Sequence, residues 1–159
     1  MTDRGVELQR LTELPFFRYL PQWALVRVAE RAREDRVEAG SVILHQHDTA
    51  RDVHFLLNGA VQVLMRVAGK DLLFAVLTEP GQLIGWSAFR PPFRYTTTIG
   101  CEEDSALIRV PVAAFEEIFE RDPALGYEVL RRVAFSVAER FEGARATLHG
   151  LPRRGPVGG

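Results

Sequence analysis

Residues 53–63 read VHFLLNGAVQV, two β-rich runs joined by Asn58-Gly59. Asn and Gly adopt positive φ more readily than other residues, and the two-residue turn of a tight hairpin requires positive φ at both positions. The flanking valines and phenylalanine favour strands. This stretch predicts a β-hairpin and places β-structure at the centre of the chain.

Further short β-rich runs surround this stretch between residues 37 and 110. Turn-forming pairs at Ala39-Gly40, Gly69-Lys70 and Pro80-Gly81 separate them. Many short strands without intervening helices are typical of a sandwich, a jelly roll or a small barrel. The runs expected as strands are Ser41–Leu44, Val53–Leu57, Ala60–Ala68, Asp71–Leu77, Tyr95–Gly100 and Ser105–Val110.

Helical periodicity flanks the β-rich region on both sides. Residues 6–35 carry apolar residues at helical spacing, and the segment from Ala124 to about Thr147 repeats an apolar residue every four positions. Such a stripe packs on its own domain or, in a helix longer than a small barrel is wide, against a second copy. The stripe consists of Leu125, Val129, Val133, Val137 and Phe141.

The expected fold class is mainly β, a double-stranded β-helix (jelly roll) with flanking helices and a long C-terminal helix. Its expected organisation is an N-terminal helical segment at 1–35 packed on the barrel, the jelly roll at 36–110, C-terminal helices including a dimer helix at 111–148, and a disordered tail at 149–159.

The composition is typical of a soluble globular domain. The chain has 159 residues, of which 47% are hydrophobic and 26% charged, and its net charge is −1. This balance argues against a free-standing nucleic-acid binder, which needs an excess of positive charge. A single cysteine, Cys101, excludes an intrachain disulfide, and no apolar run approaches the about 20 residues of a membrane span. We expect a cytoplasmic domain without a signal peptide.

One candidate site is a metal centre at His45 and His47. On a strand these two imidazoles would point to the same face and could share a metal ion, with Asp52 or His54 as a further ligand. The arrangement resembles the first metal motif of the cupins, a family of jelly-roll enzymes. The second motif of that family would add a histidine after a Pro-x-Gly, and none is found there.

A second candidate site is the loop of residues 79–98. Gly85 is followed by the start of a short helix at Trp86–Phe89, and backbone N–H groups at such a start favour an anion. Arg94, one of 19 arginines among the 20 basic residues, could close on that anion bidentately, with Thr96 adding a hydroxyl. The loop therefore predicts an anion-binding site.

Short segments spread along residues 14–147 carry an ordered set of motifs. They are Leu14–Phe17, Leu20-Pro21, Val37–Gln46, Val53–Val63, Pro80–Gly85, Phe115–Ile118 and Asp122-Pro123. Together they resemble the cyclic nucleotide-binding domain family, the sensory half of bacterial catabolite-activator-type and Fnr-type regulators. The resemblance implies a jelly roll with a phosphate-binding cassette after Pro80–Gly85 and a long C-terminal helix that forms a dimer.

The resemblance also implies roles for single residues of the cassette. In the family a Gly-Glu pair places its Glu on the ribose 2′-hydroxyl, and a later Arg pairs with the cyclic phosphate; Gly85 matches the Gly and Arg94 the Arg. Trp86 stands at the Glu position, and an indole cannot accept a hydrogen bond from a hydroxyl. Tyr95 stands where the family has a small residue. These departures predict weak cAMP binding and leave another anionic ligand open.

An aromatic pocket around Arg94 is the expected consequence of these departures. It would be formed by Trp86, Phe89, Phe93 and Tyr95. The residues expected to bind the ligand or its phosphate are Gly85, Trp86, Ser87, Arg94, Thr96 and Thr97.

The function expected from the sequence is a stand-alone regulatory domain, not an enzyme, that binds a small anionic, nucleotide-like ligand. It would need no cofactor and would signal through a homodimer helix to an unknown protein partner. Residues 149–159 leave no room for a helix-turn-helix, so direct DNA binding is not expected. Two alternatives stay open: a cupin-type metal-dependent enzyme using His45 and His47, and a ligand-free degenerate domain acting as an interaction module.

Overall fold

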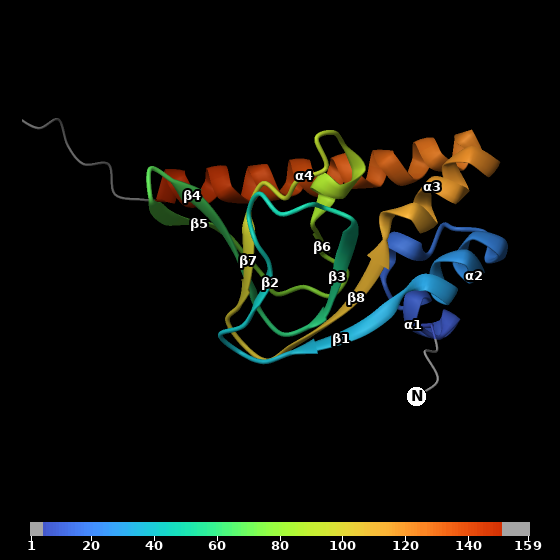
Figure 1. Ribbon diagram of the computed structural model, residues 1–159, viewed down its shortest axis with the longest axis horizontal. Helices are drawn as coiled ribbons and strands as arrows, with labels where there is room; N and C mark the ends of the chain where they lie inside the picture. Colours follow the sequence, from blue (N-terminus) through green and yellow to red (C-terminus); the bar gives the residue numbers. More distant parts are fainter. Residues whose placement is uncertain (1–4, 151–159) are drawn as a thin grey trace, which may run out of the picture.

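The chain folds as a jelly roll of two antiparallel β-sheets (Figure 1). The computed structural model describes residues 5–150, with side chains as far as residue 146. Within that part, the strand orders are β1-β8-β3-β6 and β2-β7-β4-β5. The strands are β1 (Arg33–Val37), β2 (Val42–Leu44), β3 (Asp52–Asn58), β4 (Val61–Val67), β5 (Lys70–Leu77), β6 (Leu83–Ile84), β7 (Thr98–Cys101) and β8 (Ser105–Pro111). The predicted mainly-β jelly roll is thereby confirmed.

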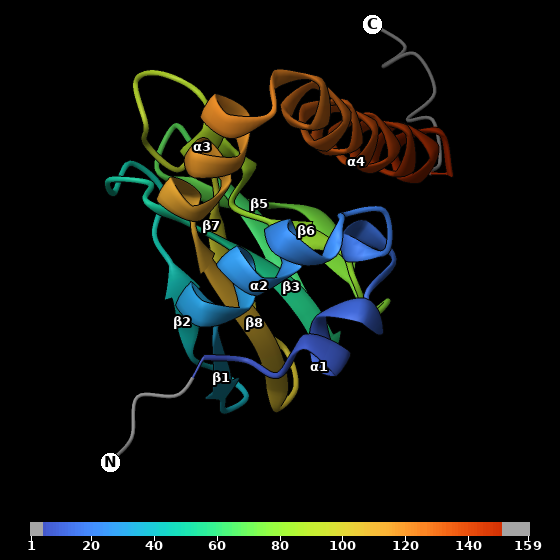
Figure 2. The ribbon, with the colours of Figure 1, turned by 90° about the vertical axis from the view of Figure 1, so that its right-hand side faces the viewer.

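Helices pack at one end of the jelly roll and along one of its sides (Figures 1 and 2). The short N-terminal helices and α3 lie together at one end, and α4 runs along the barrel. The α4 helix begins where the sequence predicts, because Asp122 Oδ1 accepts the backbone N–H of Leu125 and Pro123 needs no N–H in a first turn. The bounds are α1 (Leu8–Thr12), η1 (Pro15–Phe17), α2 (Gln22–Arg31), η2 (Trp86–Phe89), α3 (Val112–Arg121) and α4 (Pro123–Gly150).

The hairpin predicted at Asn58-Gly59 is wrong. Strands β3 and β4 lie in different sheets, so the chain crosses here from one sheet to the other. Gly59 has φ 101°, and a Cβ on it would lie 2.2 Å from Ser105 Oγ and 2.7 Å from the carbonyl oxygen of Asp104. Glycine is therefore required for a close approach between two segments, not for a hairpin turn.

A two-residue hairpin forms instead at Ala68-Gly69, between β4 and β5. Both residues have positive φ, 50° and 77°, and Val67 pairs with Lys70 across the turn. This is the geometry that matches the right-handed twist of an antiparallel pair.

The helical segment expected at 6–35 ends earlier than predicted. Helix α2 stops at Arg31, and Arg33–Val37 form the edge strand β1, which pairs with β8. Its residues alternate between half-buried and exposed, the period-2 pattern of a strand with one face covered. An ion pair of 2.8 Å between Asp35 and Arg109 links this edge strand to β8.

Strand β7 begins later than predicted, at Thr98 instead of Tyr95. The backbone of Tyr95 pairs with a turn, accepting from the N–H of His47 and donating to the carbonyl of Asp48, which keeps it outside the sheet. From residue 151 onward, the tail predicted at 149–159 lies outside the described residues.

An aromatic cluster joins the jelly roll to its helices. Phe16 and Phe17 of η1 contact Phe55 of β3, with ring centroids 4.8 and 4.7 Å apart, and Phe115 of α3 closes the cluster. These rings are all buried. The cluster fixes the N-terminal helices and α3 against the first sheet and leaves α4 as the element next to the second sheet.

The apolar stripe of α4 faces the protein's own domain. Val129 and Val133 are buried in the core, and Leu125 packs against it. Phe141, the last member of the predicted stripe, is instead 62% exposed. Among the helices of the described part, none has the length and apolarity needed to cross a membrane.

Candidate ligand cavity beside the C-terminal helix

A cavity of about 210 Å³ lies between the second sheet, η2 and α4. Strands β4, β5 and β7 provide an apolar floor, η2 and the segment after it provide hydroxyl groups, and α4 forms the remaining wall. The lining residues are Val63, Met65, Phe74, Gly85, Trp86, Ser87, Tyr95, Thr96, Thr97, Ile99, Val137, Arg140 and Phe141. A mostly apolar enclosure with a few polar groups is the usual composition of a small-molecule site.

Gly85 makes the sharp turn that brings η2 to this cavity. Its φ is 82°, and a Cβ on it would lie 3.1 Å from Cε1 of Tyr95 and 3.2 Å from the carbonyl oxygen of Asp52. The Tyr95 hydroxyl donates to that same Asp52 oxygen at 2.8 Å, so the ring is held below the turn. Burial raises the pKa of the Tyr95 hydroxyl, which stays protonated and able to donate.

The hydroxyl groups of the cavity come from two segments. Ser87 of η2 is buried, and its Oγ lies 3.3 Å from Oγ1 of Thr96, so either can donate to the other. Thr97 lines the same wall. Rotatable hydroxyls of this kind can donate to or accept from a bound ligand.

Among the described residues, the one charged side chain that lines the cavity comes from α4. Arg140 donates from Nη2 to the carbonyl oxygen of Leu83, and its Nε has no hydrogen-bond partner among the described residues. Burial lowers the pKa of Arg140 to about 10, because the charged form loses solvation. The guanidinium nevertheless stays protonated at neutral pH.

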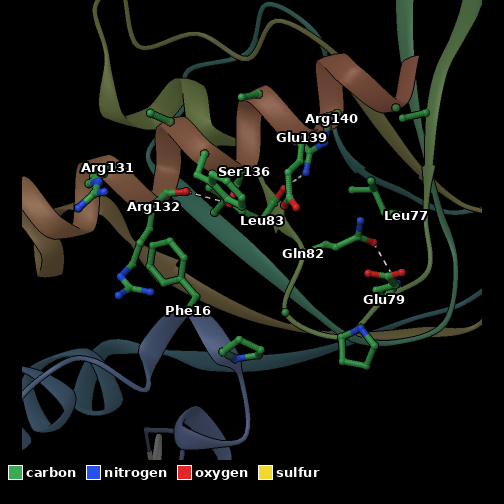
Figure 3. A pocket seen from close by; sticks show the side chains of 18 of the residues that line it. Phe16, Leu77, Glu79, Gln82, Leu83, Arg131, Arg132, Ser136, Glu139 and Arg140 are labelled. Atoms are coloured by element: carbon green, nitrogen blue, oxygen red, sulfur yellow. Dashed lines mark hydrogen bonds between the residues drawn. The ribbon is translucent and has the colours of Figure 1, made fainter. Parts of the chain in front are cut away.

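A larger open groove of about 1040 Å³ lies on the other side of Arg140 (Figure 3). It separates α4 from η1 and from the turn between β5 and β6. The Arg132 guanidinium lies over the ring of Tyr19, 3.3 Å from its centroid, at the wall of this groove. Figure 3 shows Arg140 reaching from α4 towards Leu83. Arg140 lines both the groove and the smaller cavity.

The sequence model described as "Cyclic nucleotide-binding domain" matches residues 34–122, more than half of the chain. The chain belongs to the cyclic nucleotide-binding domain family. The resemblance noted from its motifs is thereby confirmed.

Solved structures with this fold include proteins of bacteria. A protein of Geobacter metallireducens GS-15, assigned as cyclic nucleotide-binding, is 25% identical with a TM-score of 0.74, over 85% of this chain and 98% of that one. The sensor domain of the transcriptional regulator DNR from Pseudomonas aeruginosa has a TM-score of 0.70 at 18% identity, over 84% of this chain and 90% of that one, and it shows the fold alone.

A curated relative is much longer than this chain. Patatin-like phospholipase domain-containing protein 6 of Mus musculus is 28% identical over 105 residues, which is 65% of this chain and 8% of the relative. The similarity therefore covers a small part of that protein.

The structure brings five of the six expected ligand residues to the cavity of this family member. Gly85, Trp86, Ser87, Thr96 and Thr97 all line it. The sixth, Arg94, is not among the lining residues: it is exposed, and its Nη1 donates to the carbonyl oxygen of His47 at 2.9 Å.

The aromatic pocket expected around Arg94 does not form. Trp86 and Tyr95 line the cavity, but Phe89 packs on Phe115 at 5.4 Å between ring centroids, and Phe93 is 42% exposed. Phe89 of η2 packs against α3 instead of the cavity, and Phe93 lies in the loop that follows η2.

The geometry expected for a metal site at His45 and His47 is also absent. Strand β2 ends at Leu44, so both imidazoles lie in an exposed turn, with His47 in the left-handed region at φ 77°. His54 is buried on β3. Among the described residues, no group of three His, Cys, Asp or Glu side chains is placed to hold a metal ion.

Sequence reasoning missed Arg140. The residue lies seven positions after Val133 and three after Val137, which puts it on the core-facing side of α4. A charged residue at an apolar helical position was the available signal.

Proposed function

We propose that this chain is a regulatory domain that binds a small anionic, nucleotide-like ligand in the cavity beside α4. Binding of the ligand then changes, through that helix, the contact with a second copy of the chain. The observation that carries the proposal is that one helix both forms a wall of the cavity and bears an exposed apolar face. Val137 and Phe141 line the cavity, and Phe141 is also 62% exposed.

The size of the cavity supports a link between binding and helix position. Small-molecule sites usually enclose about 300–1000 Å³, whereas this cavity measures about 210 Å³. A nucleotide-sized ligand therefore requires an outward shift of a wall. The sheet strands are held by backbone pairing along β4, β5 and β7, so α4 is the wall that can move as a unit.

An apolar stripe on α4, part of which also lines the cavity, supports pairing with a second copy. Tyr127, Leu130, Ala134, Val137 and Phe141 follow a 3-4-3-4 spacing, the heptad pattern of helices that pair along a seam. Tyr127, Leu130 and Phe141 are 66%, 43% and 62% exposed. We therefore assign the dimer contact to this stripe, because Val133, expected in that contact from its spacing, is buried in its own domain.

Calorimetric titration with cAMP and with cGMP tests the ligand proposal. We expect at least one of them to bind below about 1 mM, weakly because Trp86 replaces the carboxylate that would hold the ribose hydroxyl. Replacing Thr96, an exposed residue that lines the cavity, with Phe should weaken binding at least about tenfold by filling that space.

Thr49→Phe is the matched control for Thr96→Phe. Thr49 is likewise an exposed threonine, and it does not line the cavity. Its substitution should leave the affinity within about twofold. Absence of binding by both nucleotides would contradict the ligand proposal and favour the domain as a ligand-free interaction module.

A further inference from the structure

Arg140 is unusual among the described arginines in its surroundings. Arg10, Arg31, Arg66 and Arg109 each lie within 4.0 Å of a carboxylate. Arg140 is half-buried with its Nε fully enclosed, yet its contact within the described part is the carbonyl of Leu83. A buried charge without a counter-charge is costly, and proteins usually pair it.

The hydrogen-bonding edge that Arg140 leaves open is suited to an oxyanion. Its Nη2 donates to Leu83, whereas its Nε is buried and has no hydrogen-bond partner within residues 5–146. The Nε–H and a neighbouring Nη–H form one of the two parallel donor pairs with which arginine binds a phosphate or carboxylate bidentately. The guanidinium therefore keeps an N–H donor that no group in the described part of the chain accepts.

The remaining cavity wall offers nothing that would repel an anion. Its lining contains no Asp or Glu among the described residues, and its other polar groups are the indole N–H of Trp86 and the hydroxyls of Ser87, Tyr95, Thr96 and Thr97. Arg94, the cation expected from the sequence, is exposed and donates to His47. The positive charge available inside the cavity thus comes from α4.

We infer that Arg140 binds the anionic group of the ligand, a phosphate or carboxylate on a small molecule, in place of the cassette arginine. This assignment rests on the proposed function and adds to it the residue that contacts the charged group of the ligand. Because Arg140 belongs to α4, an anion that contacts it acts directly on the helix that bears the exposed apolar stripe. A neutral molecule of the same shape would lack that contact.

Titrations with cAMP, sodium pyrophosphate and uncharged adenosine test the assignment, with binding followed by calorimetry and by the melting temperature. We expect both anions to stabilise the wild-type protein and adenosine to have a much smaller effect. Arg140→Met should weaken cAMP binding ten- to a hundredfold, because a charge-assisted hydrogen bond is lost. The same variant should melt at a higher temperature without ligand, since it removes an unpaired buried charge.

Arg131→Met is the matched control, because it removes the same charge from an exposed position of the same helix. It should leave binding and the ligand-induced melting shift within about twofold of wild type. Arg140→Lys, which keeps the charge but not the fork of donors, should recover only part of the affinity.

The outcomes separate this assignment from the proposed function. If Arg140→Met binds cAMP as wild type does, or if Arg94→Met alone abolishes binding, the assignment is wrong and the ligand proposal stands. If pyrophosphate stabilises wild type but not Arg140→Met while no nucleotide binds, Arg140 is the anion site and the nucleotide-like ligand is wrong. If no anion stabilises the wild-type protein, both are overturned.

Discussion

Replacing Phe141 with Glu should convert a dimer of this domain into a monomer. In a two-fold contact each substitution occurs twice, so two carboxylates would have to enter an apolar seam. We expect the dissociation constant of the dimer to rise at least about a hundredfold, or about 3 kcal/mol. Sedimentation at micromolar concentration measures it: the wild-type protein should have twice the mass of the chain, and the variant the mass of one.

Phe135→Glu is the control for this experiment. Phe135 is 65% exposed, nearly the same as the 62% of Phe141, but it lies on another side of α4, next to the open groove. It should remain a dimer. Leu130→Glu, on the same stripe but away from the cavity, should behave like Phe141→Glu. A wild-type monomer at these concentrations, or equal dissociation by Phe135→Glu, would contradict the assignment of the dimer face.

Acidification should destabilise this protein through His54. The side chain is 5% exposed on β3, and burial lowers its pKa from 6.5 to about 4. The unfolded chain takes up a proton as the pH falls below about 6.5, whereas the native imidazole stays neutral until about pH 4. Stability is therefore full above the unfolded pKa and is lost across this window, by about 3 kcal/mol in total.

Urea unfolding at about pH 7.5 and about pH 4.5 measures this loss. Carboxylates also titrate in this range, so the informative quantity is the difference between wild type and His54→Gln. We expect the wild-type free energy of unfolding to fall by about 2–3 kcal/mol more than that of the variant. His45→Gln removes an exposed histidine and should retain the wild-type decrease. Equal decreases in wild type and His54→Gln would contradict this account of His54.

Several features of the fold could be predicted from local patterns. The strands from Val61 to Leu77 and from Ser105 to Val110 agree within a residue or so, because their residues alternate or stay apolar over a length typical of strands. The start of α4 follows from Asp122-Pro123, whose capping chemistry is local. Family membership could be inferred from the order of the motifs, since no single one is specific.

Other features depend on contacts that no local pattern contains. Asn58-Gly59 has the composition of a hairpin turn. Its glycine is instead required because the backbone passes close to Ser105, which lies 46 residues later in the chain. Arg94 follows the cassette as the family pattern requires, yet it bonds to His47 instead of lining the cavity. Arg140 reaches that cavity only because α4 lies across the second sheet, and a sequence pattern cannot specify that packing.

Hydrogen–deuterium exchange with and without saturating cyclic nucleotide tests the central claim most directly, namely that the cavity and α4 are coupled. The account predicts that ligand changes the exchange of amides in η2 and, together with them, in α4 between Val133 and Ala144. Thr96→Phe, with its cavity filled, should show neither change. A ligand that alters exchange in η2 while α4 exchanges as in the free protein would contradict the coupling.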